Sequence, residues 1–213
     1  MIQIKEFTFN HFEENTFIVW DESNKCVIID PGMNTTTENN KLSQFIADNN
    51  LAPEKVLLTH AHIDHIAGVR YVCETYNLPI TTHCDSKPFL SQAEDYGMAM
   101  GFGCKNMDDI ELECISDNDT ISFGNSSITA LYVPGHAAGS MAYVIDNPSV
   151  VFTGDVLFRQ SIGRTDLPTG DYDVLMKMLN TKILTLDNDC EVLPGHGPNT
   201  TIGNEKNSNP FLL

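Results

Sequence analysis

The chain contains the stretch Thr59-His60-Ala61-His62-Ile63-Asp64-His65 directly after the apolar run Val56-Leu57-Leu58. His60 and His62 are two residues apart, so on an extended segment both imidazoles project to the same side and can share one ion. Asp64 and His65 fall where the chain turns into a helical pattern, and we expect them to serve a second ion. Four potential ligands directly after a buried strand favour this interpretation over surface or helix-capping residues.

Imidazole and carboxylate ligands together suit zinc, iron or manganese, whereas calcium and magnesium prefer shells made of oxygen. The sequence therefore predicts two divalent metal ions as cofactors, with zinc as the first expectation and iron or manganese as alternatives.

Length and charge restrict the classes of function. The chain has 213 residues, enough for one sizeable core, and we expect a single domain over 1–213. Its 29 acidic and 12 basic residues give a net charge of −17, which disfavours nucleic acid and anionic membranes as partners. No run approaches the roughly 20 apolar residues of a membrane span, and residues 1–7 alternate like a strand rather than a signal peptide. We expect a cytoplasmic protein; its oligomeric state stays open.

The six cysteines are scattered without a C-x-x-C spacing, which argues against a thiolate zinc site or a redox pair. Several lie inside apolar runs, as buried free thiols do, and this fits a reducing cytoplasm. They are Cys26, Cys73, Cys84, Cys104, Cys114 and Cys190.

The order of elements predicts an α/β fold with two similar halves that pack sheet on sheet, with helices outside. Helices are expected over 37–50, from Ile66 to about Tyr76, and over 172–186. Strands are expected at 2–9, 16–20, 25–30, 55–58, 79–82, 111–115, 120–123, 127–133, 141–145, 150–153 and 191–193. The irregular segment 88–109 combines methionines with glycines, so it is either an adaptable lid over a pocket or part of the core.

Three further polar residues stand at predicted strand ends beside glycine. His136 follows Pro134-Gly135, Asp155 follows Thr153-Gly154, and His196 follows Pro194-Gly195. A glycine lets the backbone turn sharply and bring the next side chain to the edge of a sheet, where sites collect. Together with the first cluster they make seven candidate ligands, about the number that two ions sharing one carboxylate would need.

These motifs in this order resemble the metallo-β-lactamase superfamily, over nearly the whole chain. Within it the match is to short glyoxalase II-like hydrolases, because the run from Leu157 to Asp166, with its Gly163-Arg164-Thr165-Asp166, follows Thr-Gly-Asp. The resemblance implies a four-layer αββα sandwich. It also implies a first ion on His60, His62 and His136, a second on Asp64, His65 and His196, and Asp155 as the bridge, whereas His11 and His83 match no ligand position.

By the same resemblance, the function is hydrolysis of a small thioester or ester, by analogy hydroxyacylglutathione, by a hydroxide between the two ions. Asp64 would orient the water or accept its proton. Full-length glyoxalase II enzymes carry a further helical region that binds glutathione, and this chain has no room for it. Basic groups near the site are few, and Arg164 is equally explained as a structural partner of Asp166; the candidates are Lys87, Lys105, Arg159 and Arg164.

Two rival functions remain open from sequence. A mononuclear iron persulfide dioxygenase resembles this chain in fold and shares the Gly-Arg-Thr-Asp stretch. It would hold its iron with first-site histidines (His60, His62 or its equivalent, and His136) and Asp155 only. A zinc-stabilised module without catalysis would have a closed coordination shell. Asp155 disfavours a true β-lactamase, because those enzymes have no bridging aspartate at this position. The acidic net charge disfavours a nuclease relative, because those proteins have a basic surface.

Overall fold

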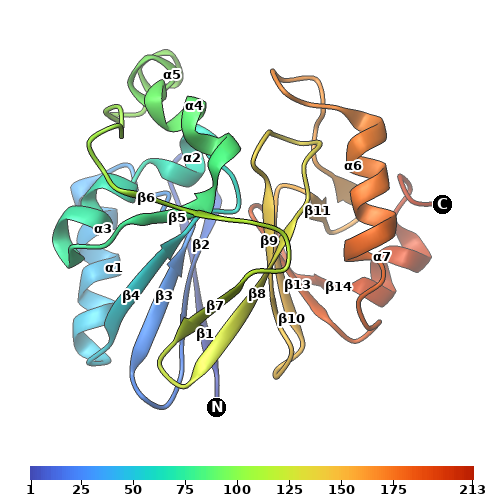
Figure 1. Ribbon diagram of the computed structural model, residues 1–213, viewed down its shortest axis with the longest axis horizontal. Helices are drawn as coiled ribbons and strands as arrows, with labels where there is room; N and C mark the ends of the chain where they lie inside the picture. The colour runs from blue at the N-terminus through green and yellow to red at the C-terminus, as the bar shows by residue number, and fades with distance from the viewer.

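Two mixed β-sheets pack face to face, with helices on both outer sides (Figure 1). The computed structural model describes residues 1–213. This is the α/β, four-layer αββα architecture that the sequence predicted, and the prediction is confirmed.

The first sheet has the strand order β1-β2-β3-β4-β5-β6. Strands β1 to β3 pair antiparallel, and β3 to β6 pair parallel through helical connections on the outer face. The strands are β1 (Gln3–Phe9), β2 (Glu14–Trp20), β3 (Lys25–Ile29), β4 (Ala52–Leu57), β5 (Ile80–His83) and β6 (Leu112–Ile115). The helices are α1 (Thr36–Asp48), α2 (Ile63–Ile66), α3 (Val69–Tyr76), the short η1 (Cys84–Ser86), α4 (Lys87–Ser91) and α5 (Ala93–Met100).

The second sheet has the order β14-β13-β10-β9-β8-β7, with a small ribbon beside it. Its strands are β7 (Thr120–Phe123), β8 (Ser126–Tyr132), β9 (Met141–Ile145), β10 (Val150–Gly154), β13 (Glu191–Pro194) and β14 (Thr200–Thr201). The ribbon is β11 (Leu157–Phe158) with β12 (Ser161–Ile162), and the helical elements are α6 (Tyr172–Met178), the π-helical turn η2 (Leu179–Ile183) and α7 (Ile202–Ser208). None of these helices has both the length and the apolar character of a membrane-spanning segment.

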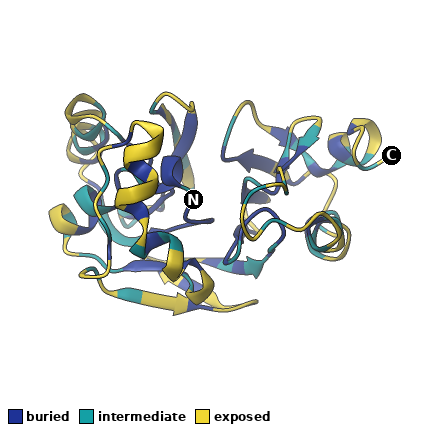
Figure 2. Cartoon of the chain, turned by 90° about the horizontal axis from the view of Figure 1, so that it is seen from above, coloured by how far each residue is buried: buried dark blue, intermediate teal, exposed yellow.

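Alternation along the strands fills three apolar layers. On β2, Phe17 and Val19 face the second sheet, while Ile18 between them faces the helices of the first half. A third cluster lies between the second sheet and its helices, around Leu175 and Val192. Figure 2 shows buried residues mainly along the strands, and exposed residues mainly in the outer helices and the loops.

The structure departs from the predicted elements where polar residues are buried or apolar ones are exposed. Strand β2 begins at Glu14 rather than residue 16, because Glu14 and Asn15 are polar yet buried. The segment 88–109 contains α4 and α5, and the tail forms α7 with Thr201 as its N-cap. The helix expected over 172–186 changes at Leu179 into a π-helical turn.

The expectation of free thiols is wrong for two of the six cysteines. Cys84 and Cys114 form a disulfide, although they are 30 residues apart in sequence. Parallel pairing of β5 with β6 sets Thr82 opposite Cys114, so the next residues of the chain bring Cys84 within reach, with 5.1 Å between the Cα atoms. Sequence spacing does not reveal such a pairing. Cys26, Cys73 and Cys190 are buried free thiols as expected.

Candidate metal centre

The first cluster of the centre is three imidazoles. His60 and His62 lie in the loop between β4 and α2, and His136 follows the turn after β8. His60 Nε2 is 3.0 Å, and His136 Nε2 2.9 Å, from His62 Nδ1. Burial lowers the pKa of His60 and of His136, and burial together with the neighbouring His136 lowers the pKa of His62 to about 4. At neutral pH the three rings are therefore uncharged and able to act as ligands.

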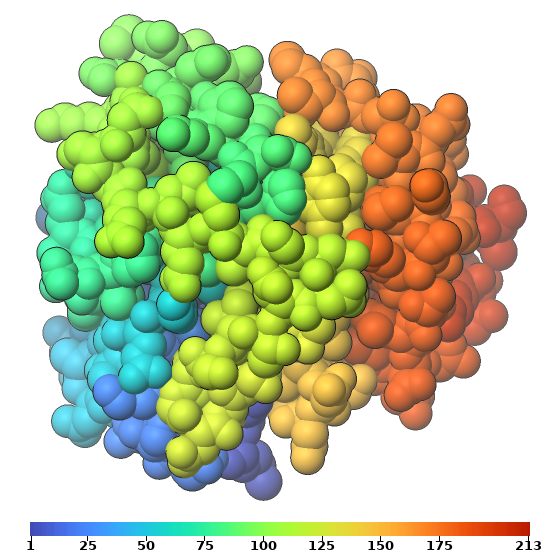
Figure 3. Space-filling model, viewed as in Figure 1, coloured from blue at the N-terminus to red at the C-terminus, as the bar shows by residue number.

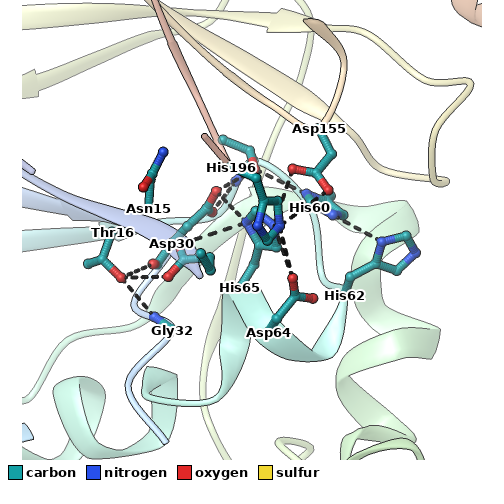
Figure 4. Close-up of polar contacts among 12 residues, drawn as sticks. Asn15, Thr16, Asp30, Gly32, His60, His62, Asp64, His65, Asp155 and His196 are labelled. Atoms are coloured by element: carbon teal, nitrogen blue, oxygen red, sulfur yellow. Dashed lines mark hydrogen bonds and ion pairs between the residues drawn. The ribbon is translucent and has the colours of Figure 1, made fainter. Parts of the chain in front are cut away.

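The second cluster joins Asp64 and His65, at the start of α2, to His196 beyond β13 (Figure 4). Asp64 Oδ2 is 3.0 Å from His196 Nε2, and the Nε2 atoms of His65 and His196 are 3.3 Å apart. Burial alone would lower the pKa of His65, but the carboxylates of Asp155, Asp64 and Asp30 outweigh it and raise that pKa. Three carboxylates thus surround His65, whereas the first cluster consists of imidazoles alone.

Asp155 lies between the clusters, directly after β10. Its Oδ1 is 3.4 Å from His65 Nε2, while its Oδ2 is 3.7 Å from His136 Nε2 and 3.6 Å from His196 Nε2. Oδ1 is buried and has no hydrogen-bond partner. Such an atom costs free energy unless a cation or a donor pairs with it, and the converging imidazole nitrogens also call for a cation. The seven predicted ligands therefore come together in one place and fit a pair of divalent ions.

Glycines allow this convergence at two of the strand ends. Gly154 has φ +49°, a conformation that L side chains rarely adopt, and it turns the chain so that Asp155 faces the histidines. A Cβ on Gly195 would lie 2.6 Å from His65 Cε1, so no larger residue fits between β13 and the centre. Gly154 and Gly195 thus occur at these strand ends because a larger residue would be strained or would clash.

Hydrogen bonds at Nδ1 fix which ring nitrogen faces the centre. His136 Nδ1 donates to the Arg164 carbonyl (2.8 Å) and His196 Nδ1 to the Phe12 carbonyl (3.0 Å). The Thr59 hydroxyl donates to Asp30 and so accepts from His60 Nδ1 at 3.1 Å. In a neutral ring with the proton on Nδ1, Nε2 keeps its lone pair for an ion.

Asp30, at the end of β3, is a functional residue that the sequence reasoning missed. Its Oδ2 accepts from His65 Nδ1 at 2.9 Å, and its Oδ1 accepts from the Thr59 backbone N–H at 2.7 Å. It therefore orients His65 and anchors the start of the histidine loop. The signal was available, since Asp30 precedes Pro31-Gly32 at a strand end like the other polar residues.

The start of β2 holds the last loop of the centre in place. The Asn15 side chain donates to the carbonyls of Pro194 (3.1 Å) and Gly197 (2.9 Å), and its backbone N–H donates to Gly195 (2.7 Å). These three hydrogen bonds join the two sheets and set the position of His196. Glu14 beside it is fully buried, and burial raises its pKa well above the ordinary value.

The two remaining histidines lie outside both clusters, as the resemblance implied. His83 stacks on Tyr132 with 4.2 Å between ring centroids. His11 contacts the Met100 carbonyl through Nε2 at 3.1 Å.

A pocket of about 260 Å³ opens beside the centre. His62, Asp64, His136 and Asp155 form its floor, so both clusters reach it. One side is formed by α4 and α5 and the other by the loop that follows β12. These two segments face each other across the notch at the top of the molecule, in green and orange (Figure 3). Segment 88–109 is therefore in part a pocket wall and in part core, where Phe102 and Met107 are buried.

Known proteins share this architecture. The model of the family described as "Metallo-beta-lactamase superfamily" matches residues 10–196. Hydroxyacylglutathione hydrolase GloC of Haemophilus influenzae is 35% identical over 203 residues, 94% of this chain and 93% of that protein. The solved structure of TTHA1623 in a di-iron-bound form is similar, with a TM-score of 0.87 and 34% identity over 98% of this chain and 100% of that one. So is the BLEG-1 B3 metallo-beta-lactamase, with a TM-score of 0.86 and 32% identity over 99% of both chains. The chain belongs to the metallo-beta-lactamase superfamily, and its histidine and aspartate clusters are those of a metallo-hydrolase.

Proposed function

We propose that the chain hydrolyses acyl thioesters of the hydroxyacylglutathione kind, with two divalent ions as cofactors. One observation carries the proposal: Asp155 lies between two three-ligand clusters, with a buried oxygen that has no hydrogen-bond partner. The name of the relative GloC supports the substrate class. We propose zinc as the metal, and the di-iron form of TTHA1623 keeps iron as the alternative.

Two ions bound in such a centre lower the pKa of a shared water towards neutrality and polarise a carbonyl oxygen. The chain's own residues orient the reaction. Asp64 and Asp155 line the pocket floor, where the thioester carbonyl would sit. Burial alone would raise the pKa of Asp64, but His65 and His196 outweigh it and lower that pKa, so Asp64 is a carboxylate at neutral pH.

As a carboxylate, Asp64 can hold the attacking water and take its proton. In the net reaction water adds across the C–S bond. The acyl carbon gains oxygen, the C–S bond breaks, and the thiolate sulfur takes up a proton.

The test measures thiol release from S-lactoylglutathione under anaerobic conditions by protein loaded with zinc, manganese or iron. We expect one thiol and one acid per thioester, no need for oxygen, and loss of turnover after chelation. Oxygen uptake with sulfite formation from a persulfide, at one iron per chain, would instead show the dioxygenase. Faster opening of a β-lactam than cleavage of any thioester would show a lactamase, which the likeness to BLEG-1 makes a necessary control.

A further inference from the structure

The pocket beside the metal centre has an apolar wall. Helices α4 and α5 supply four apolar side chains to this wall, and the opposite loop supplies two more. These side chains are Phe89, Ala93, Tyr96, Met100, Leu167 and Pro168. Phe89 stands next to the ligand His62, with 5.8 Å between ring centroids. The wall therefore begins at the metal centre.

The same apolar surface continues to the mouth of the pocket. Four of the eight large apolar side chains that are exposed in this protein belong to Phe12 and α5. Phe12, Tyr96 and Met100 line the pocket although they are 40%, 41% and 44% exposed. Apolar side chains that gather in the open at a pocket mouth indicate a binding surface.

Positive charge at the pocket is scarce. Arg164 is the one Lys or Arg among the lining residues, and it is paired with Asp166 through two hydrogen bonds of 2.7 and 2.8 Å. This confirms the structural partnership that the sequence suggested. The other basic candidates, Lys87, Lys105 and Arg159, do not line the pocket. Beside the two ions of the proposed centre, an anionic substrate would thus meet one shared guanidinium on a chain of net charge −17.

We infer that this pocket binds the acyl group, that it selects apolar acyl groups, and that the thiol half stays in solvent without recognition by charge. The inference rests on the proposed thioesterase function, and it replaces the hydroxyacyl group and the glutathione of that proposal with an apolar acyl group on a thiol that is not recognised. The thiol half of a glutathione thioester carries two carboxylates and an ammonium group, and burying these against an apolar wall would leave charges unpaired. An apolar acyl group placed there loses no hydrogen bond and removes apolar surface from water.

Four substrates separate the two halves of the thioester. D-lactoyl and phenylacetyl groups are each attached to glutathione and to N-acetylcysteamine, an uncharged thiol, and kcat/KM is measured with zinc-loaded protein. We expect phenylacetyl thioesters to be preferred at least tenfold over lactoyl ones on either thiol, because each methylene-sized apolar contact is worth about tenfold or more. We expect a change of less than about threefold between the two thiols.

A matched pair of variants places the selectivity on the wall. Met100→Glu puts a carboxylate on the pocket wall, whereas Met98→Glu makes the same change of charge on the same helix, at a side chain that is 76% exposed and does not line the pocket. Met100→Glu should reduce the preference for phenylacetyl about tenfold, and Met98→Glu should leave it unchanged. Calorimetric titration with phenylacetate gives a second readout, in which only Met100→Glu should weaken binding.

Two results would overturn the inference. One is a preference of more than tenfold for glutathione over N-acetylcysteamine with no preference for phenylacetyl. The other is an equal loss of selectivity in Met98→Glu and Met100→Glu. Either result leaves the thioesterase function standing, whereas a metal-loaded protein that cleaves none of the four substrates would remove both.

Discussion

The carboxylate of Asp30 determines which ring nitrogen of two histidines faces the candidate metal centre. Asp30 accepts a hydrogen bond from the Nδ1–H of His65, and the Thr59 hydroxyl, which donates to the same carboxylate, accepts one from the Nδ1–H of His60. In the neutral rings, both Nε2 atoms therefore face the centre with free lone pairs. Residues that touch no ion thus determine whether the ligands are ready for one.

Asp30→Asn tests this positioning. An amide in place of the carboxylate turns an N–H group towards His65 Nδ1, which then has to accept, and its Nε2 carries the proton. We expect the affinity for the second ion to fall about 10- to 100-fold while the first ion is retained. Stepwise metal titration checks this, and equal affinities in the variant and the wild type would refute the role of Asp30.

Asp64→Asn tests the catalytic assignment. The amide cannot take a proton from water, so we expect kcat to fall about 100-fold or more. The exposed Asp95→Asn on α5 is the control of equal charge change. Hydrolysis is measured on protein shown to be folded and loaded with metal, and undiminished turnover by such an Asp64→Asn protein would rule out Asp64 as the proton acceptor.

Between elements, Asp21 joins the end of β2 to the turn between β7 and β8. It accepts hydrogen bonds from Ser23, from the Asn125 backbone N–H at 2.7 Å and from the Ser126 hydroxyl at 2.9 Å. Burial alone would raise the pKa of Asp21, but these bonds outweigh it and lower the pKa from 3.8 to about 2. A carboxyl with a depressed pKa stabilises the fold above its unfolded pKa and loses that contribution as pH falls.

We therefore expect metal-free protein to lose stability as pH falls from about 4 to 2, and Asp21→Asn to remove part of that dependence. At pH 7 the variant should be about 1–3 kcal/mol less stable, because the amide nitrogen cannot accept the bonds from Asn125 and Ser126. Urea unfolding at several pH values measures both effects. Asp189→Asn, an exposed residue without side-chain hydrogen bonds, should match the wild type; an unchanged pH profile in Asp21→Asn would contradict the account.

At the scale of the whole molecule, the sequence predicts most of what apolar periodicity and strand-end glycines encode. The αββα layers follow from runs such as Val150 to Phe152, and the seven candidate ligands follow from polar residues placed after such runs. Asn15 could not be predicted, because its side chain bonds to the carbonyl of Pro194, which lies 179 residues away in the sequence. The disulfide and α5 were missed for related reasons: Cys84 meets Cys114 only through strand pairing, and Met98 and Met100 are apolar yet exposed.

The most direct test of the central claim is the number of ions per chain, measured by elemental analysis after loading with zinc and removal of free metal. Two clusters that share Asp155 predict two ions in the wild type, one in His196→Ala, and two in the control His83→Ala, whose ring lies outside both clusters. One ion in the wild type, or two in His196→Ala, would contradict the account.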